Sequence, residues 1–247
     1  MRIFLAGNGG YHYDKKDNFY DFYRLLSYHS FPKMLLPVIH KYKDFILDSG
    51  IFTYLNLDKY KKQASSIDWQ KYLVDYSNFV RENRIKNYVE LDLDNVIGLQ
   101  EVERLRQELE KRVGWKTMPV WHINRGYDKW LEICRNYDYI CFGSFLTDNL
   151  SQNKYRTINK FISDASKCNY KVHGLGMTSM KWLQILKFYS VDSSSWLAGV
   201  RYGTVPYFDG KIIKTIKKPT NHQIKDSKKL ARHCMYEWIK YSKYMDS

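Results

Sequence analysis

The chain has 247 residues, with 40 lysines and arginines against 26 aspartates and glutamates, which gives a formal net charge of +14. Hydrophobic residues make up 44% and aromatic residues 17%, and this apolar content excludes an intrinsically disordered chain. The length suits one compact domain over residues 1–247, and the basic charge favours a polyanionic partner, nucleic acid first, although charge also serves solubility.

The first ten residues, MRIFLAGNGG, contain an apolar run that is shorter than the hydrophobic part of a signal peptide. No stretch approaches the roughly 18 apolar residues that a membrane span needs. The four cysteines form no C-x-x-C pair, so neither a disulfide framework nor a zinc finger is indicated. We therefore expect a cytoplasmic protein without a membrane segment.

Short apolar or alternating runs recur along the chain, and amphipathic segments lie between them. We expect strands at 3–6, 45–47, 88–94, 118–122, 139–144, 171–176 and 190–193. We expect helices at about 18–29, 68–84, 99–113, 127–136, 155–167 and 179–188. This alternation predicts a parallel α/β fold, and seven or eight repeats without a linker favour a compact (β/α)8 TIM-like barrel.

A doubly wound open sheet is the competing architecture. A Rossmann domain places G-x-G-x-x-G after its first strand, whereas the segment Gly7-Asn8-Gly9-Gly10 lacks the third glycine in register. The barrel is therefore preferred. Residues 211–247 are expected to supply a closing barrel strand at 211–218 and a basic amphipathic helix at 226–244.

Acidic residues lie where three of the expected strands end, at Asp48, Asp92 and Asp192. In the run 89–94, alternation predicts that Glu90, Asp92 and Asp94 face the barrel axis. Buried carboxylates are costly unless they bind a ligand, a metal or each other. A metal site is one interpretation, but no His-x-His spacing supports it. Two carboxylates can instead act as nucleophile and general acid/base in glycosyl transfer, which needs no metal or other cofactor.

Several of these strand ends carry the motifs of one family. Asp48-Ser49-Gly50-Ile51-Phe52 resembles the D-S-G-G-F/Y motif of tRNA-guanine transglycosylases, and His173-Gly174-Leu175-Gly176, with Asp192 behind it, resembles their M-G-V-G element and nucleophile loop. Glu90-Leu91-Asp92, Pro119-Val120-Trp121-His122 and Phe142-Gly143-Ser144 follow the order of the family's base-recognition strands. The resemblance covers roughly residues 44–204. The family's zinc motif is missing, so the chain looks most like the phage DpdA proteins, which insert 7-deazaguanine bases into DNA.

The resemblance implies a role for each of these residues. Asp192 would attack C1′ of the nucleoside, and Asp48 would manage the proton on the departing or incoming purine. Asp92 would bind the N1/2-amino edge of the base, with Asp94 left open as the alternative. His122 and the backbone around Gly143 and Ser144 would read the O6 edge. Phe52 and His173 would stack on the two faces of the base, with Gly174 beside His173. The alternatives are that Phe52 is a core residue and that His173 is a hydrogen-bonded histidine of the barrel interior.

The same resemblance implies a role for the basic charge. A base inside a duplex must be flipped out to reach a barrel rim, and phosphate contacts would supply the energy. Arg201 matches a family arginine and Arg125 follows the fourth expected strand, so both are candidates to bind the DNA backbone. Further basic candidates are Lys214, Lys217, Lys218, Lys225, Lys228, Lys229 and Arg232.

The sequence thus predicts a base-exchange transglycosylase that replaces guanine in duplex DNA with a 7-deazaguanine of the preQ0 type. The same chemistry on tRNA is the first alternative, and a non-catalytic nucleic-acid-binding barrel is the second. The oligomeric state is left open.

Overall fold

A computed structural model describes residues 1–8, 19–51, 54, 67–143, 152–177, 179–217 and 226–247 of the chain. In this part of the chain, parallel strands alternate with helices that cover one face of the sheet, which confirms the expected mixed α/β class. The expected residues Phe52 and Ser144, together with Lys218 and Lys225, lie outside the described residues.

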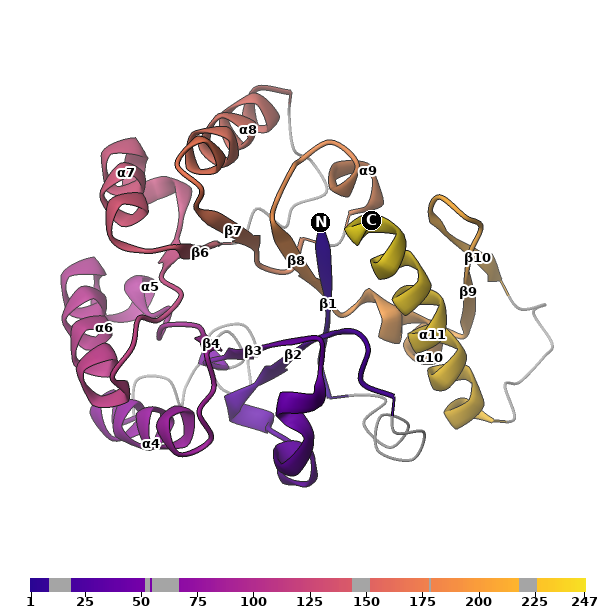
Figure 1. The fold of residues 1–247 in the computed structure, drawn as a ribbon, viewed down its shortest axis with the longest axis horizontal. Coiled ribbons are helices and arrows are strands. Elements are labelled where there is room, and N and C mark those ends of the chain that lie inside the picture. The colour runs from indigo at the N-terminus through magenta and orange to yellow at the C-terminus, as the bar shows by residue number, and fades with distance from the viewer. Residues whose placement is uncertain (9–18, 52–53, 55–66, 144–151, 178, 218–225) are drawn as a thin grey trace.

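Eight parallel strands form one curled sheet in the described part of the chain (Figure 1). They are β1 (Arg2–Ala6), β2 (Tyr23–Ser27), β3 (Asp44–Asp48), β4 (Asn87–Tyr88), β5 (Val120–Trp121), β6 (Tyr139–Phe142), β7 (Lys171–Gly174) and β8 (Ser190–Ser193). Their order across the sheet is β4-β3-β2-β1-β8-β7-β6-β5. Each strand therefore pairs with a neighbour in the chain, and the last strand pairs with the first, as in a TIM-like fold.

The curled sheet is not a fully closed barrel, because the described edge strands β4 and β5 share no ladder. One isolated parallel bridge joins Val89 to Met118. At this bridge the amide of Glu90 donates to the carbonyl of Met118 at 3.1 Å, and the amide of Met118 donates to the carbonyl of Tyr88 at 2.8 Å. We call this narrow junction the β4–β5 seam.

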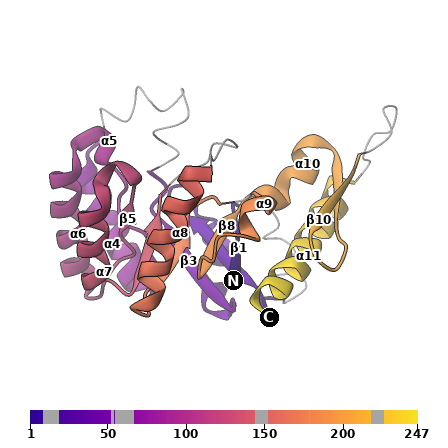
Figure 2. The same cartoon turned by 90° about the horizontal axis from the view of Figure 1, so that it is seen from above.

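Helices cover the outer face of the curled sheet (Figures 1 and 2). The helices of the described residues are α4 (Trp69–Glu82), α5 (Asp94–Ile97), α6 (Leu99–Val113), α7 (Gly126–Asn136), α8 (Gln152–Lys167), α9 (Met180–Leu183), α10 (Ala198–Tyr202) and α11 (Ser227–Asp246). Short 3-10 helices are η1 (Tyr28–Ser30), η2 (Lys33–Lys41), η3 (Ile123–Arg125) and η4 (Ser195–Leu197). Local signals set several ends: the Asp68 side chain accepts from the amide of Lys71 at the start of α4, and Gly114 ends α6 in the left-handed region.

The core has an inner and an outer part. The inner cluster contains Phe4, Leu25, Ile46, Val120 and Cys141 and draws its members from strands and strand ends only. The outer clusters join strand residues to helix residues and lie between the sheet and the helices. Because side chains alternate along a strand, the inner cluster identifies which residues of β1, β2, β3, β5 and β6 face the inside of the curled sheet.

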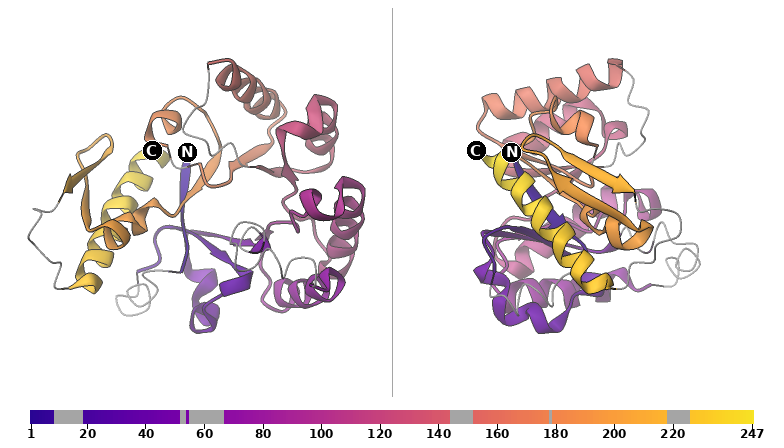
Figure 3. Two further views of the ribbon diagram at one scale, coloured as in Figure 1. Left: turned by 180° about the vertical axis from the view of Figure 1, so that it is seen from behind. Right: turned by 90° about the vertical axis from the view of Figure 1, so that its right-hand side faces the viewer.

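The C-terminal segment departs from the expected closing strand. Residues of β10 (Ile213–Lys217) pair antiparallel with β9 (Thr204–Phe208) in a separate two-stranded sheet, so the expected barrel strand at 211–218 is wrong. The basic helix is present as α11, which packs against β9 and β1. Figure 3 shows α11 beside this hairpin, with both chain ends close together. The terminal amino group donates to the carbonyl of Met245, which ties these ends to each other.

Three further element predictions are wrong. Of the helix expected at 179–188, only α9 (Met180–Leu183) forms. The helix expected at 18–29 is replaced by β2, whose central residues Arg24 and Leu26 are buried on the outer face while Tyr23 and Leu25 are buried on the inner face. The strand expected at 88–94 is the two-residue β4, and residue 94 already begins α5. Of the helices in the described residues, none has the length and apolar character that a bilayer crossing requires.

Candidate functional site

The carboxyl ends of the eight strands meet at one edge of the curled sheet, as parallel strands require. Asp48 ends β3 two residues after the inward Ile46, and Asp192 in β8 pairs in register with the inward Phe4. His122 follows β5 two residues after the inward Val120. Alternation therefore brings all three polar side chains to the inner face at the same edge, as the sequence predicts.

Asp48 has an environment that favours its protonated form. Its Oδ2 accepts from the amide of Gly50 at 2.9 Å, which closes a tight turn after β3. Burial raises the pKa of Asp48 to about 7, and the charges of Asp192 and Asp92 add to this effect against the hydrogen bond from Gly50. A carboxyl group with a pKa near neutrality can both give and take a proton, which is what a general acid/base needs.

The turn after Asp48 depends on glycine at position 50. Gly50 has φ +83°, and a Cβ there would overlap the side chains of His29 and Ser27. The D-S-G sequence thus has a local physical reason, since only glycine fits both the backbone angle and the space beside β2. Nearby, the hydroxyl of Tyr72 donates to the carbonyl of Ser49 at 2.6 Å and holds the turn against α4.

Asp192 is buried and held through one of its oxygens. Oδ1 accepts from the amide of Gly176 at 2.6 Å and lies 3.3 Å from Nε2 of His173. Gly176 belongs to the loop after β7, and its φ of +60° aims the amide at the carboxylate. The H-G-L-G segment therefore supplies two contacts to the candidate nucleophile.

His173 lies inside the curled sheet and has no exposed ring face. It is fully buried, and Phe4 and Tyr139 meet its ring edge-to-face at centroid distances of 5.7 and 6.3 Å. Its Nδ1 lies 2.7 Å from the hydroxyl of Ser190. This setting does not fit the expected stacking on a base, and it fits a histidine that orients Asp192.

Asp92 and His122 form a close pair from neighbouring sheet edges. Nε2 of His122 lies 2.7 and 2.9 Å from the two carboxylate oxygens of Asp92. Burial disfavours the charged imidazole, but the hydrogen bond and charge of Asp92 outweigh it and raise the pKa of His122. The pair offers a carboxylate acceptor beside an N–H donor at the inner edge of the sheet.

Gly143 makes room for the imidazole of His122. A Cβ at Gly143 would overlap Cε1 and Nδ1 of that ring, so any larger residue displaces it. The amide of Gly143 donates to the carbonyl of Trp121 at 2.7 Å. This amide is therefore occupied by the sheet and is not aimed at a base, in contrast to the expected reading of O6.

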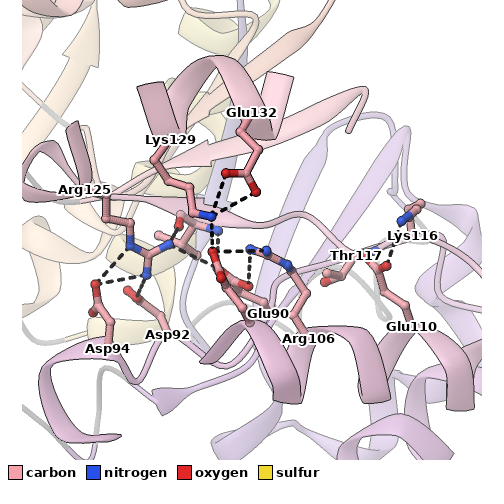
Figure 4. A network of polar contacts seen from close by, with 12 residues as sticks. Glu90, Asp92, Asp94, Arg106, Glu110, Lys116, Thr117, Arg125, Lys129 and Glu132 are labelled. Atoms are coloured by element: carbon pink, nitrogen blue, oxygen red, sulfur yellow. Dashed lines mark hydrogen bonds and ion pairs between the residues drawn. The ribbon is translucent and has the colours of Figure 1, made fainter. Parts of the chain in front are cut away.

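Arg125 is not available for a DNA backbone (Figure 4). Only 2% of its side chain is exposed. The guanidinium lies 3.0 Å from Asp94 and within 3.8 Å of Asp92 and Glu90. The expectation that Arg125 clamps phosphate is therefore wrong: it neutralises the acidic residues that follow β4.

Asp92 and Asp94 differ in accessibility. The side chain of Asp92 is 29% exposed and that of Asp94 is 8% exposed. Asp94 begins α5 and accepts from Nε of Arg125 at 3.0 Å. Of the two, Asp92 is the carboxylate that a ligand at this edge can reach.

Glu90 faces outward, not toward the axis as expected, because Val89 takes the inward position and alternation then turns the next residue to the helix side. Oε2 of Glu90 accepts from Arg106 of α6 at 3.3 Å, and Oε1 accepts from the amide of Val120 at 2.6 Å. Burial raises the pKa of Glu90 to about 7, although Arg106 and Arg125 oppose the rise. Figure 4 shows Glu90 directed toward Arg106 of α6.

The remaining predicted residues lie apart from this group. Arg201 is exposed on α10, which follows β8. Gly174 ends β7 next to Met177 and Phe188, on the helix side of the sheet, and so does not face the inner edge. Sequence reasoning missed Tyr139 and Ser190, which lie behind His173 and whose only sequence signal is their inward position on expected strands.

A divalent ion has one possible set of ligands in the described residues. Oxygen and nitrogen atoms of Asp92, Asp94 and His122 lie within 4.8 Å of one another. The guanidinium of Arg125 already places a positive charge against both carboxylates. Arg125 therefore already neutralises these carboxylates, and a metal ion would have to displace its guanidinium.

Taken together, the inner edge carries a carboxyl group with a pKa near 7, an oriented carboxylate and an acceptor–donor pair. Comparison of the chain with protein-family models and with curated proteins found no match.

Proposed function

We propose that the chain is a base-exchange transglycosylase that replaces guanine in DNA with a 7-deazaguanine base, and that its curled sheet is a (β/α)8 TIM-like barrel without the zinc subdomain of that superfamily. The observation that carries the proposal is the pair Asp48 and Asp192. Both lie at the inner strand-end edge, yet one is poised to exchange a proton while the other is held by two donors on Oδ1. Titratable neighbours in contrasting environments are typical of acid/base and nucleophile assignments.

The reaction follows from these two groups. Oδ2 of Asp192 forms a bond to C1′ as the bond from C1′ to N9 of guanine breaks, and Asp48 gives its proton to the departing base. The incoming 7-deazaguanine returns a proton to Asp48 as its N9 attacks C1′. The bond from C1′ to Oδ2 of Asp192 breaks as the bond to N9 forms, which restores both carboxyl groups. Every proton and electron pair is accounted for without a cofactor.

The pair Asp92 and His122 supports recognition of a guanine-type base. A carboxylate accepts two hydrogen bonds in parallel, which matches the N1–H and 2-amino donors, and the imidazole supplies a donor for O6. Engagement of a base would redirect the Asp92 oxygens that now face Nε2 of His122.

The proposal is tested by trapping the covalent intermediate. Wild-type protein is incubated with guanine-containing duplex DNA, and the DNA-linked protein is counted on a denaturing gel, with nucleoside mass spectrometry for the inserted base. Asp192→Ala should abolish both signals and leave DNA binding in place, whereas Asp128→Ala, at an exposed aspartate of α7, should change neither. An active Asp192→Ala protein overturns the assignment. Labelled guanine release from tRNA but not from DNA would instead favour the tRNA alternative.

A further inference from the structure

Behind the candidate nucleophile lies a row of polar side chains from three adjacent strands. The hydroxyl of Tyr139 on β6 lies 2.6 Å from the hydroxyl of Ser190 on β8. The same Ser190 oxygen lies 2.7 Å from Nδ1 of His173 on β7, and Nε2 of that ring lies 3.3 Å from Oδ1 of Asp192. Ser190 and His173 are fully buried. We call the row Tyr139–Ser190–His173 the relay.

The direction of the protons in the relay follows from the chemistry of its end. An ionised carboxylate only accepts, so Nε2 of His173 must carry the hydrogen that faces Asp192. In the neutral ring Nδ1 is then the acceptor, and Ser190 donates to it. The Ser190 oxygen in turn accepts from Tyr139. One arrangement therefore satisfies all three contacts in sequence.

We propose that Tyr139 and Ser190 hold His173 as its Nε2–H tautomer. Together the three act as positioning residues that present one oxygen of Asp192 for reaction. The tautomer part rests on these contacts together with an ionised Asp192 and a neutral His173, whereas the reaction part rests on the proposed function. No motif carries this role for Tyr139 and Ser190, and it replaces base stacking as the role of His173.

The arrangement distinguishes the two oxygens of Asp192. Both Gly176 and His173 contact Oδ1, and no described residue is hydrogen-bonded to Oδ2. Rotation of the carboxylate would break two hydrogen bonds at once, so Oδ2 stays directed away from them. The ring that makes one of these bonds is itself fixed by edge contacts with Phe4 and Tyr139. Such orientation matters because a misplacement of about 1 Å at a reacting atom can cost roughly a hundredfold in rate.

The tautomer is measured by long-range 1H–15N NMR of the histidine rings, with the His173 signals assigned through their loss in His173→Gln. Wild-type protein should show a protonated Nε2 and an unprotonated Nδ1. Ser190→Ala removes the donor to Nδ1 and should yield a mixture of tautomers. The control Ser242→Ala removes another buried serine hydroxyl, one that donates to the carbonyl of Ile3, and should leave the wild-type pattern.

The kinetic test asks whether the relay acts through His173. Ser190→Ala and Tyr139→Phe should slow formation of the covalent DNA adduct about tenfold or more with little change in DNA affinity, because orientation and not binding is lost. A glutamine at position 173 places an amide donor near the former Nε2 and needs no relay. Ser190→Ala added to His173→Gln should therefore cause no further loss.

The two levels of the proposal fail separately. A wild-type Nδ1–H tautomer, or a Ser190→Ala spectrum identical to wild type, overturns the relay whatever the activity. Wild-type protein that exchanges no base, with the predicted tautomers in place, overturns the proposed reaction and leaves the relay standing. If the rate losses of Ser190→Ala and His173→Gln add up in the double variant, Ser190 does not act through the histidine.

Discussion

Asp48 is a carboxyl group whose ionisation opposes folding. Its pKa in the folded chain is about 7, above the ordinary value of 3.8, so the folded state binds this proton more tightly than the unfolded state. The stability linked to Asp48 is complete below about pH 4 and is lost as the pH rises toward 7. The loss amounts to at most about 4 kcal/mol, from three units at about 1.36 kcal/mol each.

Asp48→Asn should remove this pH dependence. We expect the variant to gain stability over wild type between pH 4 and pH 8, with the difference levelling off above pH 8, because asparagine keeps the oxygen that accepts from Gly50 and never ionises. Urea unfolding at each pH measures the difference. The exposed Asp128→Asn serves as the control, and parallel stability curves for Asp48→Asn and wild type would refute the assigned pKa.

Gly143→Ala tests how closely His122 packs on β6. The added methyl overlaps the imidazole, so we expect the Asp92–His122 pair to separate and stability to fall by about 1–3 kcal/mol. Gly174→Ala is the milder comparison, since its Cβ would lie 3.2 Å from its neighbours. The His122 NMR shifts and thermal unfolding report the two effects. Unchanged His122 signals in Gly143→Ala would mean that the ring has room to move.

At the scale of elements, Glu90 and Arg106 connect α6 to the β4–β5 seam through a buried ion pair. Arg106→Met keeps much of the side-chain volume but leaves a buried carboxylate with weaker compensation, and breaking such a pair costs about 3–5 kcal/mol. The cost should appear at pH 8, where Glu90 is ionised, and shrink at pH 5, where its raised pKa keeps it protonated. Urea unfolding at both pH values measures this, and adding Glu90→Gln should recover stability at pH 8. An equal loss at both pH values would show that the charge is not responsible.

The elements also show where sequence reasoning succeeds. The helix expected at 99–113 matches α6 because its periodicity ends at Gly114, which supplies a left-handed cap. The strand β2 was predicted as a helix because it is buried on both faces and so shows no alternation. The run after Val89 alternates and was predicted as a strand, yet strand pairing ends at the Val89 bridge and α5 begins at Asp94.

Part of the candidate site could also be predicted from the sequence, and part could not. Asp48, His122 and Asp192 could be placed at one edge from sequence, since parallel strands end together. The contacts of Ser190 with His173 and of Glu90 with Arg106 could not, because they depend on which segments lie side by side and which way each side chain points. Arg125 was misplaced for this reason: its burial comes from three acidic residues on a different segment.

At the scale of the whole molecule, the net charge of +14 predicts salt-dependent binding to DNA. Each phosphate contact contributes about 0.9 to the slope of log K against log salt concentration. Arg201→Ala on exposed α10 should reduce this slope by about one contact without loss of stability, whereas Lys71→Ala on α4 should leave it unchanged. Fluorescence anisotropy with a labelled duplex over a salt series measures the slope. The same slope in Arg201→Ala as in wild type would remove Arg201 from the interface.

The order of strands around the ring has a consequence for how the protein is made. β1–β4 and β5–β8 are two consecutive runs of four strands, joined by the ladder between β1 and β8 and by the β4–β5 seam. The first run contributes Asp48 and is followed by Asp92, while the second contributes Asp192 and includes the strand before His122. Neither run alone contains both the proposed acid and the proposed nucleophile. Since chains emerge from the ribosome with the N-terminus first, the nascent protein carries no assembled site until β8 has been synthesised and has joined β1.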